Sequence, residues 1–326
     1  IAEYDESSTN QWGYESDNKM LSLQTGLNNT KQDSNNSLVL YYNLYDREYD
    51  EKGIIDNYYS YVAGSKFDYS GLFNERTSYG FGGDYKYEWG DFENRGSYSA
   101  STKGNSDNLA IFGNLGYEFF EKTFFSFFVR NDNHKITSNN RTYKLSLNKK
   151  FSNFDIGVAR MTGLRNPSLY ELFGTDSFGY SGNKNLDPEK SISNEITFNY
   201  NFNDKIKFST NLFRTSIRNN IEYSSNKYIN DNDNIDLVQS GFDSHIEFGD
   251  KNLNYNFFSS YLSSKTKSGA DQLRRPSKRY GLNIYKKFGN DQSNGINLNL
   301  SYTHYGKHFD THSSTFARTE MDSTDI

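Results

Sequence analysis

The sequence predicts an all-β fold, an antiparallel up-and-down transmembrane β-barrel, from three observations. These are an aromatic-rich composition, a period-two alternation of apolar and polar residues, and connectors of two alternating sizes. The 326 residues include 27 Tyr, 26 Phe and 2 Trp, so aromatic residues make up 17% of a chain that is only 34% hydrophobic. Aromatic side chains suit a pleated, half-buried surface, whereas Leu and Ala would dominate a helical bundle.

The alternation is clearest from Tyr79 to Trp89. Every second residue there is aromatic or glycine, and the residues between them are polar or glycine, which is the pattern of a strand with one apolar face. It returns around 109–119, 143–148, 196–202 and 296–303. No apolar run approaches the roughly 18 residues of a membrane-spanning helix, whereas alternating barrel strands are compatible with the low mean hydropathy of −0.90.

Fourteen complete strands are predicted, many of them close to the 9–11 residues, roughly, that cross a bilayer at a tilt. A fifteenth is expected to start near Glu320. Short turns rich in Asn, Asp, Ser and Gly alternate with longer polar connectors, such as 46–56 and 90–107, as they do between the two rims of an outer-membrane barrel. The fourteen ranges are 19–29, 37–46, 57–71, 78–89, 108–119, 122–131, 140–150, 153–163, 191–202, 205–224, 234–249, 253–263, 277–288 and 295–306.

Charge and composition exclude several classes of protein. The chain has 36 Lys+Arg and 41 Asp+Glu, a net charge of −5, which argues against a nucleic-acid partner. It has no cysteine, and no hydrolase or metalloprotease motif, so no enzyme is expected. Two alternatives to the barrel stay open. One is a soluble β-sandwich or solenoid with its apolar face turned inward, and the other is a disordered or aggregation-prone Asn/Tyr-rich chain.

The connector 163–190 carries the most specific motif. It holds R-N-P-S-L-Y-E-L-F-G from Arg165 and G-N-K-N-L-D-P-E-K-S from Gly182. Asn166 and Asp187 each precede a proline, so each is expected to cap a short helical turn with Pro at its first position. A capped turn that leads into the next strand would explain the motif without any ligand.

This motif pair resembles the segment of TonB-dependent outer-membrane receptors that leaves one mid-barrel strand, crosses the outer rim and enters the next. Further similarity lies in S-G-F-D at 240–243, and the ranges 273–276 and 305–310 look closest to the cobalamin-receptor branch. The residues that carry the main resemblance are Arg165, Pro167, Leu169, Tyr170, Leu172, Gly182, Asn183, Leu186, Pro188, Glu189 and Glu195.

The resemblance implies a receptor of the bacterial outer membrane that imports a scarce large nutrient, with cobalamin or another corrinoid as the expected one. It also implies a 22-stranded barrel, a plug domain and a TonB-type energy-coupling protein as partners. Residues 1–326 are expected to be part of that barrel, from about its eighth to its twenty-first strand, with the plug domain, the first strands and the last strands absent. A siderophore or other nutrient receptor of the same family, and a surface β protein or adhesin without transport, are the alternatives.

Outer-loop residues are expected to bind the nutrient and the membrane. Rings and hydroxyls for a ligand are expected from Tyr49, Tyr170, Phe178 and Tyr180. Arg274 and Arg275 are expected to contact an anionic ligand or the phosphates of lipopolysaccharide. Lipopolysaccharide and outer-membrane lipid are therefore both expected partners. The resemblance to cobalamin receptors also implies calcium in acidic loops. Calcium takes about six to eight oxygens, more than one loop supplies, so a solvated acidic loop tip is the alternative. The calcium candidates are Asp46, Glu48, Asp50 and Glu51.

Overall fold

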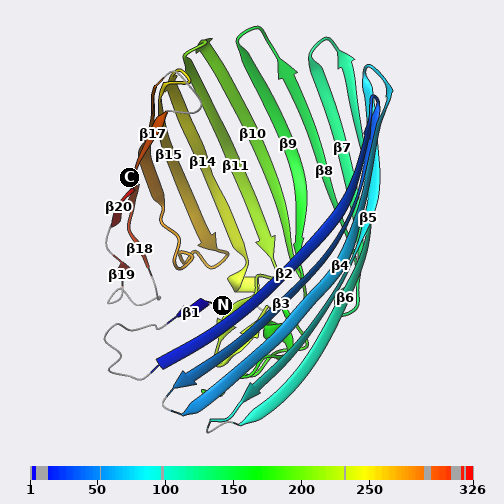
Figure 1. The fold of residues 1–326 in the computed structure, drawn as a ribbon, viewed down its shortest axis with the longest axis vertical. Helices are drawn as coiled ribbons and strands as arrows, with labels where there is room; N and C mark the ends of the chain where they lie inside the picture. The colour runs from blue at the N-terminus through cyan, green and yellow to red at the C-terminus, as the bar shows by residue number, and fades with distance from the viewer. Residues whose placement is uncertain are drawn as a thin grey trace.

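The computed structural model describes residues 2–4, 14–51, 53–96, 99–230, 233–289, 295–309, 317–318 and 321–325. Within them a single antiparallel sheet of sixteen strands follows chain order and curves into a barrel wall (Figure 1). Its strands are β1 (Ala2–Tyr4), β2 (Tyr14–Lys31), β3 (Ser34–Glu51), β4 (Ile54–Asn74), β5 (Thr77–Asn94), β6 (Ala100–Phe120), β7 (Thr123–His134), β8 (Ser138–Lys150), β9 (Phe154–Arg165), β10 (Glu189–Asn203), β11 (Ile206–Arg218), β14 (Leu237–Gly249), β15 (Leu253–Thr266), β16 (Lys278–Phe288), β17 (Ile296–Tyr305) and β20 (Met321–Asp325).

Smaller elements lie in the connections. They are the helix α1 (Leu169–Phe173), the 3-10 turn η1 (Asp233–Ile235), the hairpin of β12 (Glu222–Ser224) with β13 (Lys227–Ile229), and the pair β18 (His308–Phe309) and β19 (Ala317–Arg318). No helix of the described residues is long and apolar enough to cross a membrane. We call the rim with the connections 32–33, 75–76, 121–122 and 204–205 the short-turn rim, and the opposite rim, which carries α1, the loop rim.

The predicted strands are confirmed one for one by β2 to β11 and β14 to β17, and the fifteenth by β20. Several boundaries were wrong. The expected connectors 46–56 and 90–107 are mostly strand, since β3 runs to Glu51 and β6 begins at Ala100, and the range 205–224 ends as a barrel strand at Arg218. Hydrophobic alternation stops where a strand leaves the apolar layer, but backbone pairing continues beyond it, so the pattern underestimates long strands.

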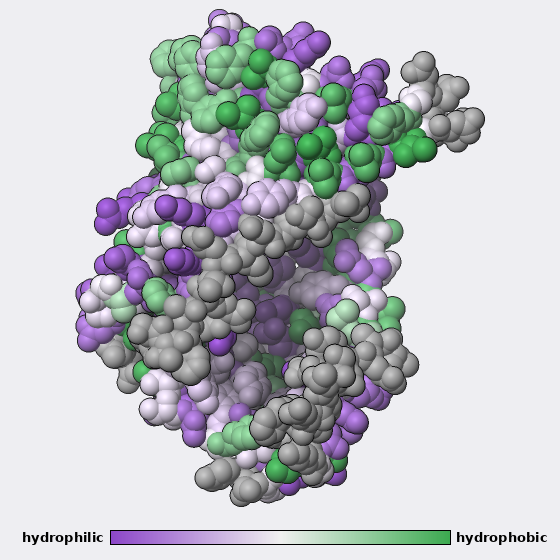
Figure 2. All heavy atoms as spheres, turned by 90° about the vertical axis from the view of Figure 1, so that its left-hand side faces the viewer, coloured by the Kyte–Doolittle hydropathy of each residue, from purple (hydrophilic) through white to green (hydrophobic). Residues whose placement is uncertain are grey.

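Exposure separates the two faces of the wall. Phe81 and Ile111, on the outward face of β5 and β6, are 51% and 64% exposed, whereas their inward neighbour Ala110 is fully buried. Hydrophobic residues gather over the upper part of the surface in Figure 2, toward the short-turn rim, and hydrophilic residues prevail below. Exposed rings such as that of Phe81 therefore point away from the bore, as a membrane barrel requires and a sandwich with a dry interior does not allow.

The inward face carries polar contacts instead of an apolar core. Arg130 of β7 reaches both Asp84 of β5 and Asp132 of its own strand, and Asn108 of β6 donates to Asp132 at 2.8 Å. Glu195, Thr197 and Asn199 of β10 likewise face inward and alternate with outward Ile196 and Phe198. The charges of Arg130, Asp84 and Asp132 are paired with one another, because an unpaired charge is costly in such a partly buried position.

Candidate ligand-binding site at the loop rim

The connection between β9 and β10 folds into the mouth of the barrel and carries the helix α1 near its start. Its cap is Ser168, whose Oγ accepts the Glu171 N–H at 3.2 Å, while the Glu171 carboxylate accepts the Ser168 N–H at 2.7 Å. The predicted cap at Asn166 was wrong by two residues, because this reciprocal capping box satisfies two backbone donors at once. Asp187 does not cap a helix either, since Pro188 leads directly into β10.

Two glycines on the inner wall make room for α1 and for the ring of Phe92 beside it. A side chain at Gly104 of β6 would collide with the ring of Phe173. A Cβ at Gly90 of β5 would lie 2.8 Å from the ring of Phe92 and 3.4 Å from Leu169. The Thr102 hydroxyl donates to the Phe173 carbonyl at the same place. The loop from β9 is thus held against strands that lie far from it in the sheet order.

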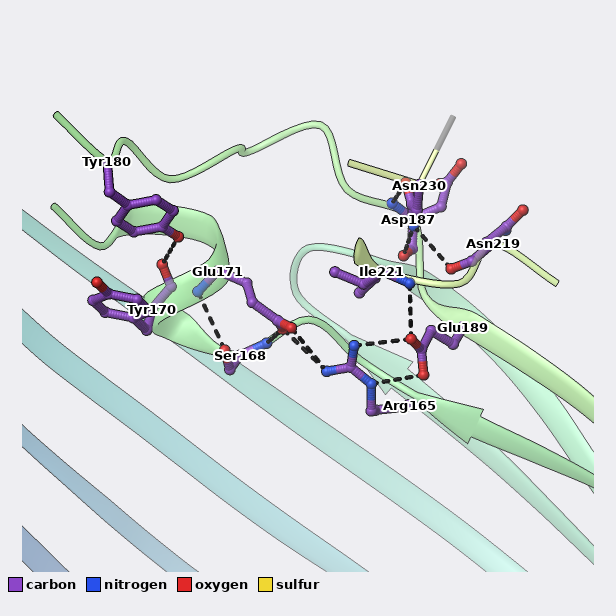
Figure 3. A network of polar contacts seen from close by, with 10 residues as sticks. All are labelled: Arg165, Ser168, Tyr170, Glu171, Tyr180, Asp187, Glu189, Asn219, Ile221 and Asn230. Atoms are coloured by element: carbon purple, nitrogen blue, oxygen red, sulfur yellow. Dashed lines mark hydrogen bonds and ion pairs between the residues drawn. The ribbon is translucent and has the colours of Figure 1, made fainter. Parts of the chain in front are cut away.

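Arg165 fixes the base of this loop, as Figure 3 shows. Its Nη1 lies 3.1 Å from both carboxylate oxygens of Glu171, and its Nε lies 2.7 Å from Oε2 of Glu189. Glu189 also accepts the Ile221 N–H at 2.8 Å. The hydrogen bonds that Arg165 donates to Glu189, and then those that it donates to Glu171, raise the pKa of its guanidinium above the usual value. One cation therefore joins the end of β9, α1, the start of β10 and the loop after β11.

The loop between β11 and β14 covers the first loop. Asn183 donates to the Tyr228 carbonyl at 2.9 Å. Asn230 accepts the Asp187 N–H at 3.2 Å while it donates to the Asn219 carbonyl at 3.3 Å (Figure 3). Because buried backbone groups need such partners, the two loops are expected to move as one unit.

Aromatic rings from both loops and from two strands form one cluster. Tyr170 packs with its ring centroid 5.7 Å from those of Tyr58 and Phe92, and 4.8 Å from that of Tyr180. Tyr180 donates its hydroxyl to the Tyr170 carbonyl at 2.7 Å and meets Tyr228 at 5.8 Å. Burial raises the pKa of the phenols of Tyr58, Tyr170 and Tyr180, so all three stay neutral hydrogen-bonding groups.

A cavity of about 740 Å³ opens beside this cluster. Tyr49, Tyr170 and Phe178, three of the residues expected to bind a ligand, line it together with Tyr58 and Phe92. Phe178 is 60% exposed, whereas Tyr180 is only 3% exposed and supports Tyr170 from behind. The volume of the cavity lies in the range of about 300–1,000 Å³ that is typical of small-molecule sites.

Sequence reasoning missed Tyr58 and Phe92, although the sequence held a signal for them. Both occupy inward positions, since Phe92 is in phase with the inward Asp84 of β5 and is the cross-strand partner of Tyr58, at places where the alternation calls for a polar side chain. Phe92 is 5% exposed. An aromatic residue on the polar face of a predicted barrel strand, near its outer end, therefore indicates a ring that faces the mouth.

The cavity is also charged, with three carboxylates against one guanidinium. Arg47, which donates to Ser16 at 3.3 Å, lines it together with Asp56, Glu88 and Asp176. Asp56 accepts a hydrogen bond from Ser177, and Asp176 accepts the Phe178 N–H at 2.8 Å. This excess of negative charge disfavours an anionic occupant.

Arg274 and Arg275 are not brought to this cavity. They lie in the loop between β15 and β16, where the Arg274 N–H donates to the Phe309 carbonyl at 2.7 Å. Arg275 lines a separate cavity of about 290 Å³ with Asp271 and His308. Their expected contact with an anion stays a prediction, at a place apart from the aromatic cluster.

The calcium candidates lie on a strand and not at a loop tip. Asp46, Glu48 and Asp50 alternate along β3 on its outward face, and Lys19 is the cross-strand partner of Asp46. The side chain of Glu51 lies outside the described residues. In the described part of the chain, no group of three or more acidic or histidine side chains could hold a metal, so the calcium prediction gains no support.

Most of the motif residues act within the loop. Pro167, Leu172, Leu186 and Pro188 are buried, and a Cβ at Gly182 would lie 2.5 Å from the backbone of α1. Leu169 packs toward Gly90, and Glu195 lies on the inner wall of β10. The motif thus specifies how the loop folds into the mouth.

The family follows from a comparison with family models. The model of the TonB dependent receptor-like β-barrel matches residues 2–324. The chain therefore belongs to the TonB-dependent receptor family, whose barrels are located in the bacterial outer membrane. No curated protein matches the sequence.

Solved structures show the same fold. The ferric yersiniabactin uptake receptor FyuA from Yersinia pestis has 12% identity and a TM-score of 0.71, and the match covers 96% of this chain and 54% of that one. The FrpB iron transporter from Neisseria meningitidis has 10% identity and a TM-score of 0.70, over 95% and 55%. The siderophore receptor PiuA from Acinetobacter baumannii has 13% identity and a TM-score of 0.72, over 95% and 57%. The chain thus spans little more than half the length of these structures.

Proposed function

We propose that the chain is the larger part of the barrel of a receptor that imports a scarce nutrient, with energy from a TonB-type coupling protein. The observation that carries the proposal is the aromatic cavity at the loop rim, built by a loop that folds into the mouth of a polar bore. The assignment of residues 1–326 to one partial barrel, completed by further strands and a plug domain, belongs to the same proposal.

For the ligand we propose a metal–siderophore chelate of neutral or positive charge. The similar structures are described as receptors or transporters for iron or siderophores, and a neutral or cationic chelate suits rings next to three carboxylates and one guanidinium. Cobalamin, which the resemblance of 273–276 and 305–310 favours, is the second candidate. Both predict binding by the same rings, so the ligand has to be identified by direct comparison.

The test uses the complete receptor in a strain that lacks its own copy of the gene. Uptake of radiolabelled ferric siderophores and of labelled cobalamin is measured with and without the coupling protein. Import of one ligand that depends on the coupling protein supports the proposal, and cobalamin import alone would replace the chelate with the corrinoid. Cells that bind a ligand but never internalise it would favour a surface protein without transport.

A matched pair of variants ties the uptake to the cavity. Tyr58→Ala/Phe92→Ala removes two rings from the cavity, whereas Phe127→Ala removes a ring from the outward face. Loss of one aromatic contact costs about 0.5–1.5 kcal/mol beyond the buried area, or roughly 2- to 13-fold in affinity. Equal uptake by both variants would show that the ligand binds elsewhere.

A further inference from the structure

The barrel wall opens between β8 and β9 near the loop rim. The two strands pair only from Lys144 opposite Met161 to Lys150 opposite Asp155, although β8 begins at Ser138 and β9 continues to Arg165. Beyond this point the Thr162 hydroxyl, and no carbonyl of β9, accepts the Tyr143 N–H at 2.9 Å. A cleft of about 550 Å³ lies there, walled by 139–142 on one side and 160–164 on the other, and it extends over β10 and β11.

Five cations line this cleft. They lie on neighbouring strands, since Arg160 is the cross-strand partner of Asn194, which faces Arg214, and Lys190 faces Arg218. All five are exposed, and among the described residues none forms an ion pair with a carboxylate. The five are Arg141, Arg160, Lys190, Arg214 and Arg218.

These cations share the outward face of the barrel with an apolar belt. Val158, Ile196 and Leu212, the next outward residues toward the short-turn rim, are cross-strand neighbours and are 45%, 46% and 49% exposed. On β9 and β11, the outward face thus changes from an apolar side chain to a guanidinium group between one outward residue and the next. An outward cation directly above the apolar belt lies where the hydrocarbon of a membrane gives way to its headgroups.

The charge of the cleft selects its partner. Five cations of one sign repel one another unless an anion lies among them, and guanidinium groups bind phosphate oxygens in pairs. Arg160 is already oriented, because its Nη1 donates to Asn194 Oδ1 at 3.0 Å. A ligand that carries phosphates and acyl chains would match both the cations and the belt, whereas a free anion would use only the cations.

We propose that this cleft binds the phosphorylated headgroup of a glycolipid in the outer leaflet, with its acyl chains on Leu145, Val158, Ile196 and Leu212. The proposal does not depend on what the receptor imports. It differs from the expectation for Arg274 and Arg275, which lie on the loop between β15 and β16.

The test measures glycolipid binding to the complete receptor, purified in detergent, by native mass spectrometry. The probes are diphosphorylated lipid A and the same lipid without its phosphates. The variant Arg160→Gln/Arg214→Gln/Arg218→Gln is compared with Lys144→Gln/Lys207→Gln, which removes two exposed lysines from the inward face. Retention of heat-modifiable migration in gels shows that each variant is folded.

We expect the arginine variant to bind the diphosphorylated lipid at least about tenfold more weakly than the unchanged receptor does. The affinity of the lysine variant for this lipid, and the affinity of the arginine variant for the phosphate-free lipid, should be unchanged. Equal binding of both lipids by the unchanged receptor, or normal binding by the folded arginine variant, would overturn the proposal. Displacement of the lipid by millimolar inorganic phosphate would overturn it as well, by showing a site for free anions. If the arginine variant does not fold, the unchanged receptor provides the test. Its affinity for the diphosphorylated lipid must fall as the salt concentration rises, whereas its affinity for the phosphate-free lipid must not.

Discussion

Arg165 and Glu189 face each other across the last rung of the β9–β10 pairing, with 2.7 Å between the guanidinium Nε and the carboxylate Oε2. The whole loop that carries α1 leaves and re-enters the wall at this pair. Because the same guanidinium also holds Glu171 of α1, the direction in which the loop folds is fixed at its base.

Replacement of Arg165 by Met should loosen this loop and leave the barrel intact. The pairs with Glu171 and Glu189 are partly exposed, so their loss should cost only about 1 kcal/mol. We expect limited proteolysis to cut between residues 166 and 188 several-fold faster than in the unchanged receptor. Arg275→Met serves as the control, and equal cutting of both variants would contradict the role of Arg165.

Replacement of Gly104 by Leu should abolish ligand binding without unfolding the receptor. The new side chain would occupy the place of the Phe173 ring and push α1 off the wall, whereas a Cβ at Gly113 meets only one atom, at 3.5 Å. Gly113→Leu, on the outward face, is therefore the control. Both variants should migrate as folded barrels. Normal ligand binding by Gly104→Leu would show that the packing of α1 against the wall at Gly104 is not needed for binding.

Alkaline pH should release the loop from the wall. The pKa values of Tyr58, Tyr170 and Tyr180 are raised above the ordinary value of 10.0 in the folded loop. Their contribution to stability is therefore complete below pH 10 and is lost as the pH rises toward their folded-state pKa values. Tyrosinate absorbance at 295 nm should show a late-titrating component in the unchanged receptor that is smaller in Tyr170→Phe/Tyr180→Phe, where Tyr58 remains. Identical titration curves would contradict the burial of these phenols.

Replacement of Arg130 by Met should destabilise the barrel wall. It would leave Asp84 and Asp132 unpaired, and the side chain of Asp132 is only 7% exposed. Loss of one partner from such a cluster costs about 3 kcal/mol. The midpoint of urea unfolding in lipid vesicles should fall, and Arg130→Met/Asp84→Asn/Asp132→Asn should recover part of the loss. A triple variant as unstable as the single one would show that packing by Arg130, and not its charge, matters.

The alternation of residues such as Tyr79, Phe81 and Tyr85 was enough to predict the strands, because lipid selects apolar side chains at every second position. It failed beyond the apolar layer. There Asp46 and Glu48 continue β3 as a regular strand, but no apolar residues alternate with them in a way that would reveal the strand in the sequence. The site was predictable where rings lie in loops, as for Tyr170 and Phe178.

The remaining parts of the site depend on contacts between distant strands. Tyr58 and Phe92 join the cavity only because the loop after β9 crosses to β4 and β5, and Gly104 matters only because Phe173 reaches it. The cleft between β8 and β9 depends on where pairing stops, which the alternation of either strand alone does not reveal.

The seat formed by Gly90 and Gly104 has a consequence for receptor engineering. Since these two missing side chains lie on strands that are remote from the helix they accommodate, a specificity loop transplanted alone would arrive without its docking surface. Chimeras that exchange binding preference between such receptors should therefore carry the paired glycines of the donor wall along with the donor loop.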